Sequence, residues 1–422
     1  LVFLQGGPGT GKTTLIIKLI LELLQIDNFL NIGLSAPTGK ATARLKEALN
    51  DKKNISFSKF LDQIEFQTLH RWILNSQNKS LKLKFKLKEL DIFIIDEMSM
   101  VNIDLIESVL NLLAKDCKII LVGDKNQLSP VNNCSIWNYL FEYSDNSSIK
   151  SCVVNLEKTY RNIGDIALIS SLIFNNDFSL LNQKIKELEK DNNSKEITIS
   201  KSREKDIPKD LLFSITSHLK QLNISTSNLS KKKYIFDKSI DNLLLNEKDL
   251  VDKIFLDLQS HLILCEKNSG IWSVEYLNEI VFGQKKPYDL KTLKEGVPIM
   301  CTKNNNELGL SNGDIGVLIG LKNKRKYLFR KFNDNNEEIV ALIDPSNLEN
   351  VVPAIAITIH KSQGSESEKV NILWSQNYRR NQYAVKEKKE KQNIFCRDNF
   401  ERRLFYTAVT RAKKSLNIYY LN

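Results

Sequence analysis

The sequence predicts an α/β protein built on parallel sheets, with a small β-rich module in its second half. Three observations support this fold class. A glycine-rich segment at residues 6–14 follows a short apolar strand and precedes an apolar helix. Short apolar strands then alternate with amphipathic helices through residues 1–175, which is typical of a parallel sheet covered on both faces. Strand patterns return after residue 256, so the 422 residues form more than one domain.

The glycine-rich segment fits the phosphate-binding loop pattern G-x-x-x-x-G-K-[ST] of P-loop NTPases. Its glycines let backbone N–H groups close around phosphate oxygens, and the following helix adds its positive end. We expect Lys12 to reach the β and γ phosphates and the Thr13 hydroxyl to ligate Mg²⁺. The expected cofactors are therefore ATP and Mg²⁺. The predicted nucleotide-binding residues are Gly6, Gly7, Pro8, Gly9, Thr10, Gly11, Lys12, Thr13 and Thr14.

Two further apolar strands end in polar side chains that complete such an ATPase. The strand at 91–96 ends in Asp96 and Glu97. Asp96 is expected to hold Mg²⁺, and Glu97 to polarise the attacking water as a general base. Gln127 follows the strand at 118–123, and a neutral amide there can orient water near the γ-phosphate. The remaining expected elements of this region are strands at 1–5, 32–36 and 152–156 and helices at 12–24, 38–49 and 102–114.

Composition shifts divide the rest of the chain. Residues 176–255 are rich in Lys, Asn, Ser and Glu, which predicts a helical, variable insertion between a first domain at 1–175 and a second at 256–422. Within the second domain, short strands and turn signals predict a small β-barrel at about 296–353. The charge run within 379–395 is read as a solvated loop or helix. Leu1 already lies in a predicted strand, so we expect residues upstream, whereas a closing strand at 417–421 indicates a nearly complete C-terminal end.

The charge balance favours a polyanionic partner. The formal net charge is +11, which points first to nucleic acid and second to an anionic membrane surface. No apolar run approaches the length of a membrane span, and no secretory signal opens the chain. The six cysteines are scattered, which argues against a disulfide framework and against a metal cluster. Reduced thiols and a cytoplasmic location are the expectation.

Taken together, the motifs resemble those of superfamily-1 helicases, and within them the RecD-like family, the α subunits of exodeoxyribonuclease V and their stand-alone relatives. The resemblance spans essentially the whole chain and is weakest at 176–255 and 379–395. It rests on nine ordered segments: Gly6–Thr14, Ser35–Ala41, Thr68–His70, Asp96–Met100, Gly123–Leu128, Tyr160–Arg161, Leu308–Gly316, Thr358–Glu366 and Tyr406–Arg411.

The resemblance implies two RecA-like domains with ATP held between them, and an ATP-dependent DNA helicase that moves 5′-to-3′ on single-stranded DNA. It implies that Arg161 and Arg411 are arginine fingers, which stabilise negative charge on the phosphate that is transferred. It also implies a role at duplex ends in recombinational repair of double-strand breaks, with RecB-like and RecC-like partners and no nuclease site in this chain. The implied DNA contacts are Pro37, Thr38, His70, Thr358, His360, Lys361 and Ser362.

Three alternatives remain open. The chain could be a solitary helicase without nuclease partners. It could be a DNA-binding scaffold whose ATPase has decayed, although the residues for hydrolysis are all present. A small-molecule phosphotransferase would leave the second-domain motifs unexplained.

Overall fold

The computed structural model divides into two compact units, Leu1–Ile163 and Gly164–Asn422. The structure describes residues 1–50, 60, 63–77, 85–129, 136–137, 140, 147–160, 164–190, 196–202, 206–232, 236, 247–305, 307–320, 324–332, 338–375, 395–396 and 398–421. Arg161 and almost all of the predicted charge run lie outside the described residues.

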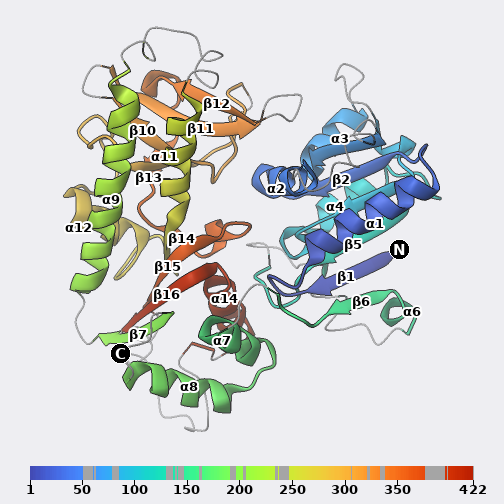
Figure 1. Cartoon of the computed structure of the whole chain (residues 1–422), viewed down its shortest axis with the longest axis horizontal. Coiled ribbons are helices and arrows are strands. Elements are labelled where there is room, and N and C mark those ends of the chain that lie inside the picture. Colours follow the sequence, from blue (N-terminus) through green and yellow to red (C-terminus); the bar gives the residue numbers. More distant parts are fainter. Residues whose placement is uncertain are drawn as a thin grey trace. The chain divides into compact units, whose positions relative to one another are not determined.

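The first unit contains a six-stranded parallel sheet in the order β3-β2-β4-β5-β1-β6 (Figure 1). The strands are β1 (Val2–Gly6), β2 (Ile32–Ala36), β3 (Ile64–Thr68), β4 (Ile92–Ile95), β5 (Lys118–Gly123) and β6 (Val153–Leu156). The helices are α1 (Lys12–Ile26), α2 (Gly39–Asn50), α3 (Leu69–Gln77), α4 (Ile103–Leu110) and α6 (Ser147–Lys150), with 3-10 turns η2 (Leu87–Glu89) and η3 (Met98–Met100). The expected parallel sheet is confirmed.

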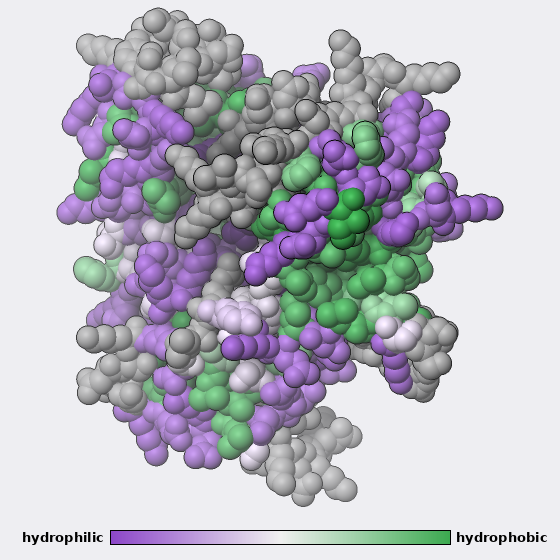
Figure 2. All heavy atoms as spheres, turned by 45° about the vertical axis from the view of Figure 1, so that its right-hand side comes forward, coloured by the Kyte–Doolittle hydropathy of each residue, from purple (hydrophilic) through white to green (hydrophobic). Residues whose placement is uncertain are grey.

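Two apolar layers cover the two faces of this sheet. Helices α1 and α2 pack Ile16, Ile20 and Leu45 onto one face, and helices α3 and α4 pack against the other. The strand β4 is buried at every position because both of its faces are covered. Figure 2 shows hydrophobic side chains that remain on the surface of this unit, where α1 exposes Leu15 and Ile26.

The second unit contains a second parallel sheet, in the order β14-β8-β15-β16-β7. Its strands are β7 (Ile197–Ser202), β8 (His261–Cys265), β14 (Ile357–Thr358), β15 (Ser367–Trp374) and β16 (Ala412–Leu421). Its helices are α7 (Asp165–Phe174), α8 (Phe178–Lys190), α9 (Lys209–Ser230), α11 (Lys248–Ser260), α12 (Val274–Phe282) and α14 (Asn399–Val409), with the 3-10 turns η7 (Pro345–Asn347) and η8 (His360–Ser362). Strand β7 lies within the segment 176–255 and completes one edge of this sheet.

The expected β-rich module is present as a small antiparallel sheet in the order β12-β11-β10-β9-β13. Its strands are β9 (Pro298–Cys301), β10 (Ile315–Ile319), β11 (Lys326–Phe332), β12 (Glu338–Ile343) and β13 (Val351–Pro353). The buried carboxylate of Glu295 ties this sheet to α9, because it accepts hydrogen bonds from the Ser227 hydroxyl at 3.1 Å, the Gly320 amide at 2.9 Å and the Ser230 hydroxyl.

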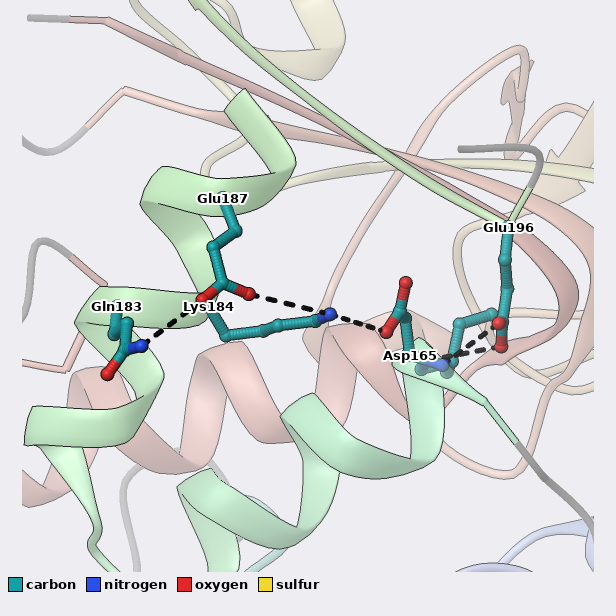
Figure 3. Close-up of polar contacts among 6 residues, drawn as sticks. Asp165, Gln183, Lys184, Glu187 and Glu196 are labelled. Carbon is teal, nitrogen blue, oxygen red and sulfur yellow. Dashed lines mark hydrogen bonds and ion pairs between the residues drawn. The ribbon is translucent and has the colours of Figure 1, made fainter. Parts of the chain in front are cut away.

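Helix α7 is held by the second unit, although the sequence places it in the domain 1–175. The Glu196 carboxylate, just before β7, accepts from the amides of Asp165 and Ile166 at 2.9 and 3.1 Å and so caps the helix N-terminus (Figure 3). Lys184 on α8 forms an ion pair with Asp165 at 2.8 Å. The division between the units at Gly164 therefore precedes the predicted boundary at 175.

A row of hydrogen-bonded side chains crosses four strands of the second sheet. Thr198 donates to Asn417 at 2.6 Å, Asn417 donates to Asn371 at 2.8 Å, and the Asn371 amide contacts the His261 ring. We call these four residues the amide ladder. It satisfies polar groups that would otherwise be costly in a buried sheet.

No helix among the described residues combines the length and the apolar character that a membrane crossing requires.

Candidate nucleotide-binding site

The phosphate loop joins the end of β1 to the start of α1, as the sequence predicts. Gly9 and Gly11 adopt positive φ angles of 75° and 84°, which glycine tolerates without a Cβ penalty. A Cβ on Gly6 would lie 2.5 Å from the Thr10 hydroxyl oxygen, so only glycine fits there. The Thr10 hydroxyl donates to the Gly7 carbonyl at 2.8 Å and fixes the loop from inside.

The Lys12 ammonium lies against the loop. Its Nζ donates to the carbonyl oxygens of Gly6 at 2.6 Å and Gly7 at 2.9 Å. This cation and the first turn of α1, which contains Thr13, are at the same end of the helix. The loop therefore presents an ammonium, a hydroxyl and a helix N-terminus together, which is a donor set that suits phosphate oxygens.

Asp96 and Glu97 follow β4 at the carboxyl edge of the sheet. The Asp96 amide donates to the Ser35 carbonyl at 2.8 Å, and its carboxylate accepts from the Glu97 amide at 2.8 Å. Burial first and the neighbouring Glu97 charge second raise the pKa of Asp96, the Lys12 charge lowers it, and the net value is about 6. Asp96 and Lys12 are thus within electrostatic reach of each other, from two separate strand ends.

Burial and the neighbouring carboxylate thus disfavour the charged form of Asp96. A divalent cation would stabilise the charged form, and the oxygen ligands available at the site, carboxylate and hydroxyl, are those that Mg²⁺ prefers. Glu97 has a φ angle of 55°, a left-handed conformation that is unusual for a residue with a side chain and that clusters at functional sites. The residues present therefore fit a nucleotide with its metal ion.

Gln127 lies in the turn after β5. Its side chain is buried, and its amide nitrogen lies 3.5 Å from the carboxylate of Asp124. Its Oε1 atom has no hydrogen-bond partner among the described residues. An acceptor buried in this way is costly, which is consistent with a side chain that completes its hydrogen bonds with bound water or ligand.

Tyr160 is a residue to which the sequence assigned no role. Its amide donates to the Gly9 carbonyl at 2.8 Å, so the chain after β6 is bonded to the phosphate loop. The residue is 69% exposed, and the Lys158 ammonium lies 5.2 Å from the centroid of its ring. Tyr160 belongs to the motif segment Tyr160–Arg161, but its place beside the loop depends on a backbone bond between residues far apart in the sequence.

The predicted DNA contacts of the first unit lie after β2 and β3. Thr38 accepts from the Ala41 amide at 3.2 Å and so caps the first turn of α2, while Pro37 precedes it and is partly exposed. His70 is exposed in the first turn of α3. The three residues come from neighbouring strand ends of one sheet, since β2 pairs with β3.

The second-unit motif forms the turn η8, directly after β14. His360 is partly exposed, and burial lowers its pKa. Burial and the charge of Lys286 lower the pKa of Lys361. Thr358 is buried, and the Ser362 hydroxyl donates to the Ile359 carbonyl at 2.7 Å inside the turn. His360 and Lys361 are therefore the more accessible side chains of this set.

Arg411 follows α14 and is almost fully buried in the second unit. Its Nε donates to the Thr407 carbonyl at 3.0 Å and its Nη1 to the Ser365 carbonyl at 3.2 Å. The second bond joins Arg411, a predicted arginine finger, to the end of the motif segment Thr358–Glu366 that contains His360. Arg161, the other predicted finger, lies outside the described residues.

Comparison with known proteins places the chain in a family. Residues 1–133 match the family model of an AAA domain, and residues 321–422 match that of a UvrD-like helicase C-terminal domain. The RecBCD enzyme subunit RecD of Buchnera aphidicola subsp. Schizaphis graminum is 31% identical over 461 residues, which cover 99% of this chain and 70% of the relative. The chain belongs to the RecD family.

A second RecD subunit, from Buchnera aphidicola subsp. Acyrthosiphon pisum, is 30% identical and covers 99% of this chain and 69% of its own length. Among solved structures, Bacteroides Pif1 bound to single-stranded DNA aligns with 99% of this chain and 88% of that chain, at 17% identity and a TM-score of 0.47. The RecD assignment confirms the family expected from the motif series.

Proposed function

We propose that this RecD-family chain is an ATP-driven DNA helicase that moves 5′-to-3′ on single-stranded DNA. It would act as the α subunit of an exodeoxyribonuclease V complex in recombinational repair of double-strand breaks. Its substrate would be single-stranded DNA and duplex ends, and the proposal assigns no nuclease step to this chain. Because chromosomal DNA is the proposed substrate, we expect the protein in the cytoplasm.

One observation carries the proposal. The Lys12 ammonium lies in the phosphate loop, within electrostatic reach of the Asp96 carboxylate. This combination is the core of a nucleotide-hydrolysing site. Family membership then supports the use of ATP energy on DNA.

The chain's own residues divide the work of hydrolysis. Lys12 and the loop amides would hold the phosphates, while Thr13 and Asp96 would hold Mg²⁺. Mg²⁺, when bound, would neutralise charge on the phosphate oxygens. Glu97 would take the proton from the attacking water, and Gln127 would orient that water.

Further residues would complete the site from its surroundings. The exposed ring of Tyr160 beside the loop would contact the base of the nucleotide. Arg161 and Arg411 are proposed to stabilise negative charge on the transferring phosphate. Arg411 lies in the same hydrogen-bonded segment as the His360 motif, so movement at one would be felt at the other.

The strand of DNA would contact both parts of the chain. Pro37, Thr38 and His70 are proposed contacts from the first unit, and Thr358, His360, Lys361 and Ser362 from the second. For Thr358 and Ser362 the buried side chains favour contact through backbone groups. Such contacts hold phosphates without reading the bases.

The decisive experiment measures ATP turnover with and without single-stranded DNA. We expect strong stimulation by DNA in the wild-type protein. Lys12→Ala should lose turnover in both conditions, because the phosphates lose their cation. Turnover that ignores DNA would contradict the helicase proposal. DNA binding at one protein per site without turnover would instead favour a scaffold whose ATPase has decayed.

Unwinding of substrates with a 5′ or a 3′ single-stranded tail would test the direction of movement along the bound strand.

Co-purification tests the partners. Recovery of RecB-like and RecC-like subunits with the tagged full-length protein would support the complex. Recovery of the chain alone with full unwinding activity would favour a stand-alone RecD-like helicase.

A further inference from the structure

One exposed aromatic ring lies directly against the second-unit motif. Phe400 is in the first turn of α14, after Asp398, whose side chain caps the helix by accepting from the Glu401 amide at 2.8 Å. The Phe400 side chain is 54% exposed, whereas Leu404 and Phe405 on the same helix are buried in the core. The cap fixes the helix start and thereby the direction of the Phe400 ring.

The ring of Phe400 stacks on the ring of His360. Their centroids are 6.1 Å apart, and the ring planes differ by 30°. A single exposed aromatic residue is ordinary in a folded protein and carries nothing by itself. Here two rings from distant segments stack at the surface, and one of them belongs to the motif proposed to contact DNA.

Two lysines belong to or lie near the same motif. Lys361 follows His360 in η8, and Lys286 is close enough to lower the pKa of Lys361 by charge repulsion. Burial lowers the pKa of His360, which favours the neutral ring, and a neutral ring can stack without removing a charge from water. Flat apolar rings beside ammonium groups form the usual surface that binds single-stranded nucleic acid.

We propose that Phe400 and His360 form a stacking platform for one base of the single strand, with Lys361 beside it for the adjacent phosphate. The proposal rests on the proposed helicase function and adds Phe400 as a base contact. Every base has a π face, so the platform holds the strand without selecting its sequence.

The test compares Phe400→Ala with wild type in binding a fluorescent dT oligonucleotide, measured by anisotropy at fixed salt. We expect binding about fivefold to thirtyfold weaker, the lower half of the range for base–aromatic stacking, because the ring is half-buried. Phe400→Trp should restore the affinity. Phe213→Ala is the matched control, since Phe213 on α9 is also an exposed phenylalanine of this unit, and its affinity should equal wild type.

An oligonucleotide that contains abasic sites separates stacking from a structural effect. On that strand the difference between wild type and Phe400→Ala should vanish, because no base remains to stack. The dependence of binding on salt should be the same in both proteins, whereas Lys361→Ala should flatten it by about one phosphate contact.

Equal affinity of wild type and Phe400→Ala for the dT strand would overturn the platform and leave the helicase proposal intact. An equal loss on the abasic strand would also overturn it, since Phe400 would then act only through the fold. A wild-type protein that binds no single-stranded DNA would instead refute the proposed function itself, together with the platform.

Discussion

The substitution His218→Phe should stabilise the second unit at pH 5 and leave it nearly unchanged at pH 7. His218 on α9 packs edge-to-face on His261, with ring centroids 4.9 Å apart, and both line a cavity of about 40 Å³ that can take up the extra volume of a phenyl ring over an imidazole. Burial lowers the pKa of His218 to about 4, with Asp257 raising it and Lys369 lowering it. Burial likewise lowers the pKa of His261, to about 3.

The magnitude follows from the difference between folded and unfolded pKa. An unfolded His218 takes up its proton near the ordinary pKa of 6.5, while the folded side chain stays neutral down to about pH 4. The stability is therefore present above pH 6.5 and is lost as the pH falls toward 4, at about 1.4 kcal/mol for each unit. From pH 7 to pH 5 the His218 contribution falls by about 2 kcal/mol, and phenylalanine has no such loss.

The assay is urea unfolding of wild type and variant at pH 7 and pH 5. The comparison must be the difference between the two proteins, because other groups also titrate. Burial raises the pKa of Glu266 to about 7, so this residue gains stability as the pH falls and opposes the histidines. Glu266 is present in both proteins and cancels. If the stability difference between the variant and wild type is the same at both pH values, the reasoning is wrong.

Three further predictions concern the phosphate loop, the proposed general base Glu97 and the buried carboxylate of Glu295. Gly6→Ala should weaken ATP binding at least about tenfold, because the new Cβ would meet the Thr10 hydroxyl at 2.5 Å; Gly39→Ala, where nothing lies within 4 Å, should bind like wild type. Equal affinities in a fluorescent-nucleotide titration would contradict this. Glu97→Gln should bind ATP normally and turn it over about 10²- to 10⁴-fold more slowly, and undiminished turnover would exclude Glu97 as the base. Glu295→Ala should cost about 3 kcal/mol of unfolding free energy, since the Ser227 and Ser230 hydroxyls and the Gly320 amide lose their acceptor; a change below about 0.5 kcal/mol would show that water replaces the carboxylate.

Local patterns predicted the first sheet well where strands are covered on both faces. The strands at 32–36 and 118–123 match β2 and β5, because an uninterrupted apolar run between turn signals is a strong signal. Strand β3 was not predicted, because its five residues alternate between apolar and polar and form no uninterrupted apolar run. Glu65 and Gln67 are nevertheless buried there, and the Gln67 amide donates to the Glu65 carboxylate at 2.9 Å.

The candidate site shows the same contrast between what the sequence predicts and what it does not. The phosphate loop is a contiguous motif, so its residues could be placed in advance. The environment of each side chain could not. The capping of α7 by Glu196, from beyond the predicted boundary, depends on a contact between residues 31 positions apart. No local periodicity carries that information.

The amide ladder has a consequence for how the second unit is assembled. Thr198 and Asn417 are 219 positions apart, and the intervening strands supply Asn371 and His261. A shift of any one strand by a single position would turn its ladder side chain to the opposite face of the sheet. The polar groups of the neighbouring ladder residues would then be buried in an apolar layer without a partner. Slipped pairings are therefore penalised at every rung. A truncated chain that ends before β16 would lack the central rung, and we expect it to fail to form this sheet even though β7, β8 and β15 are all present.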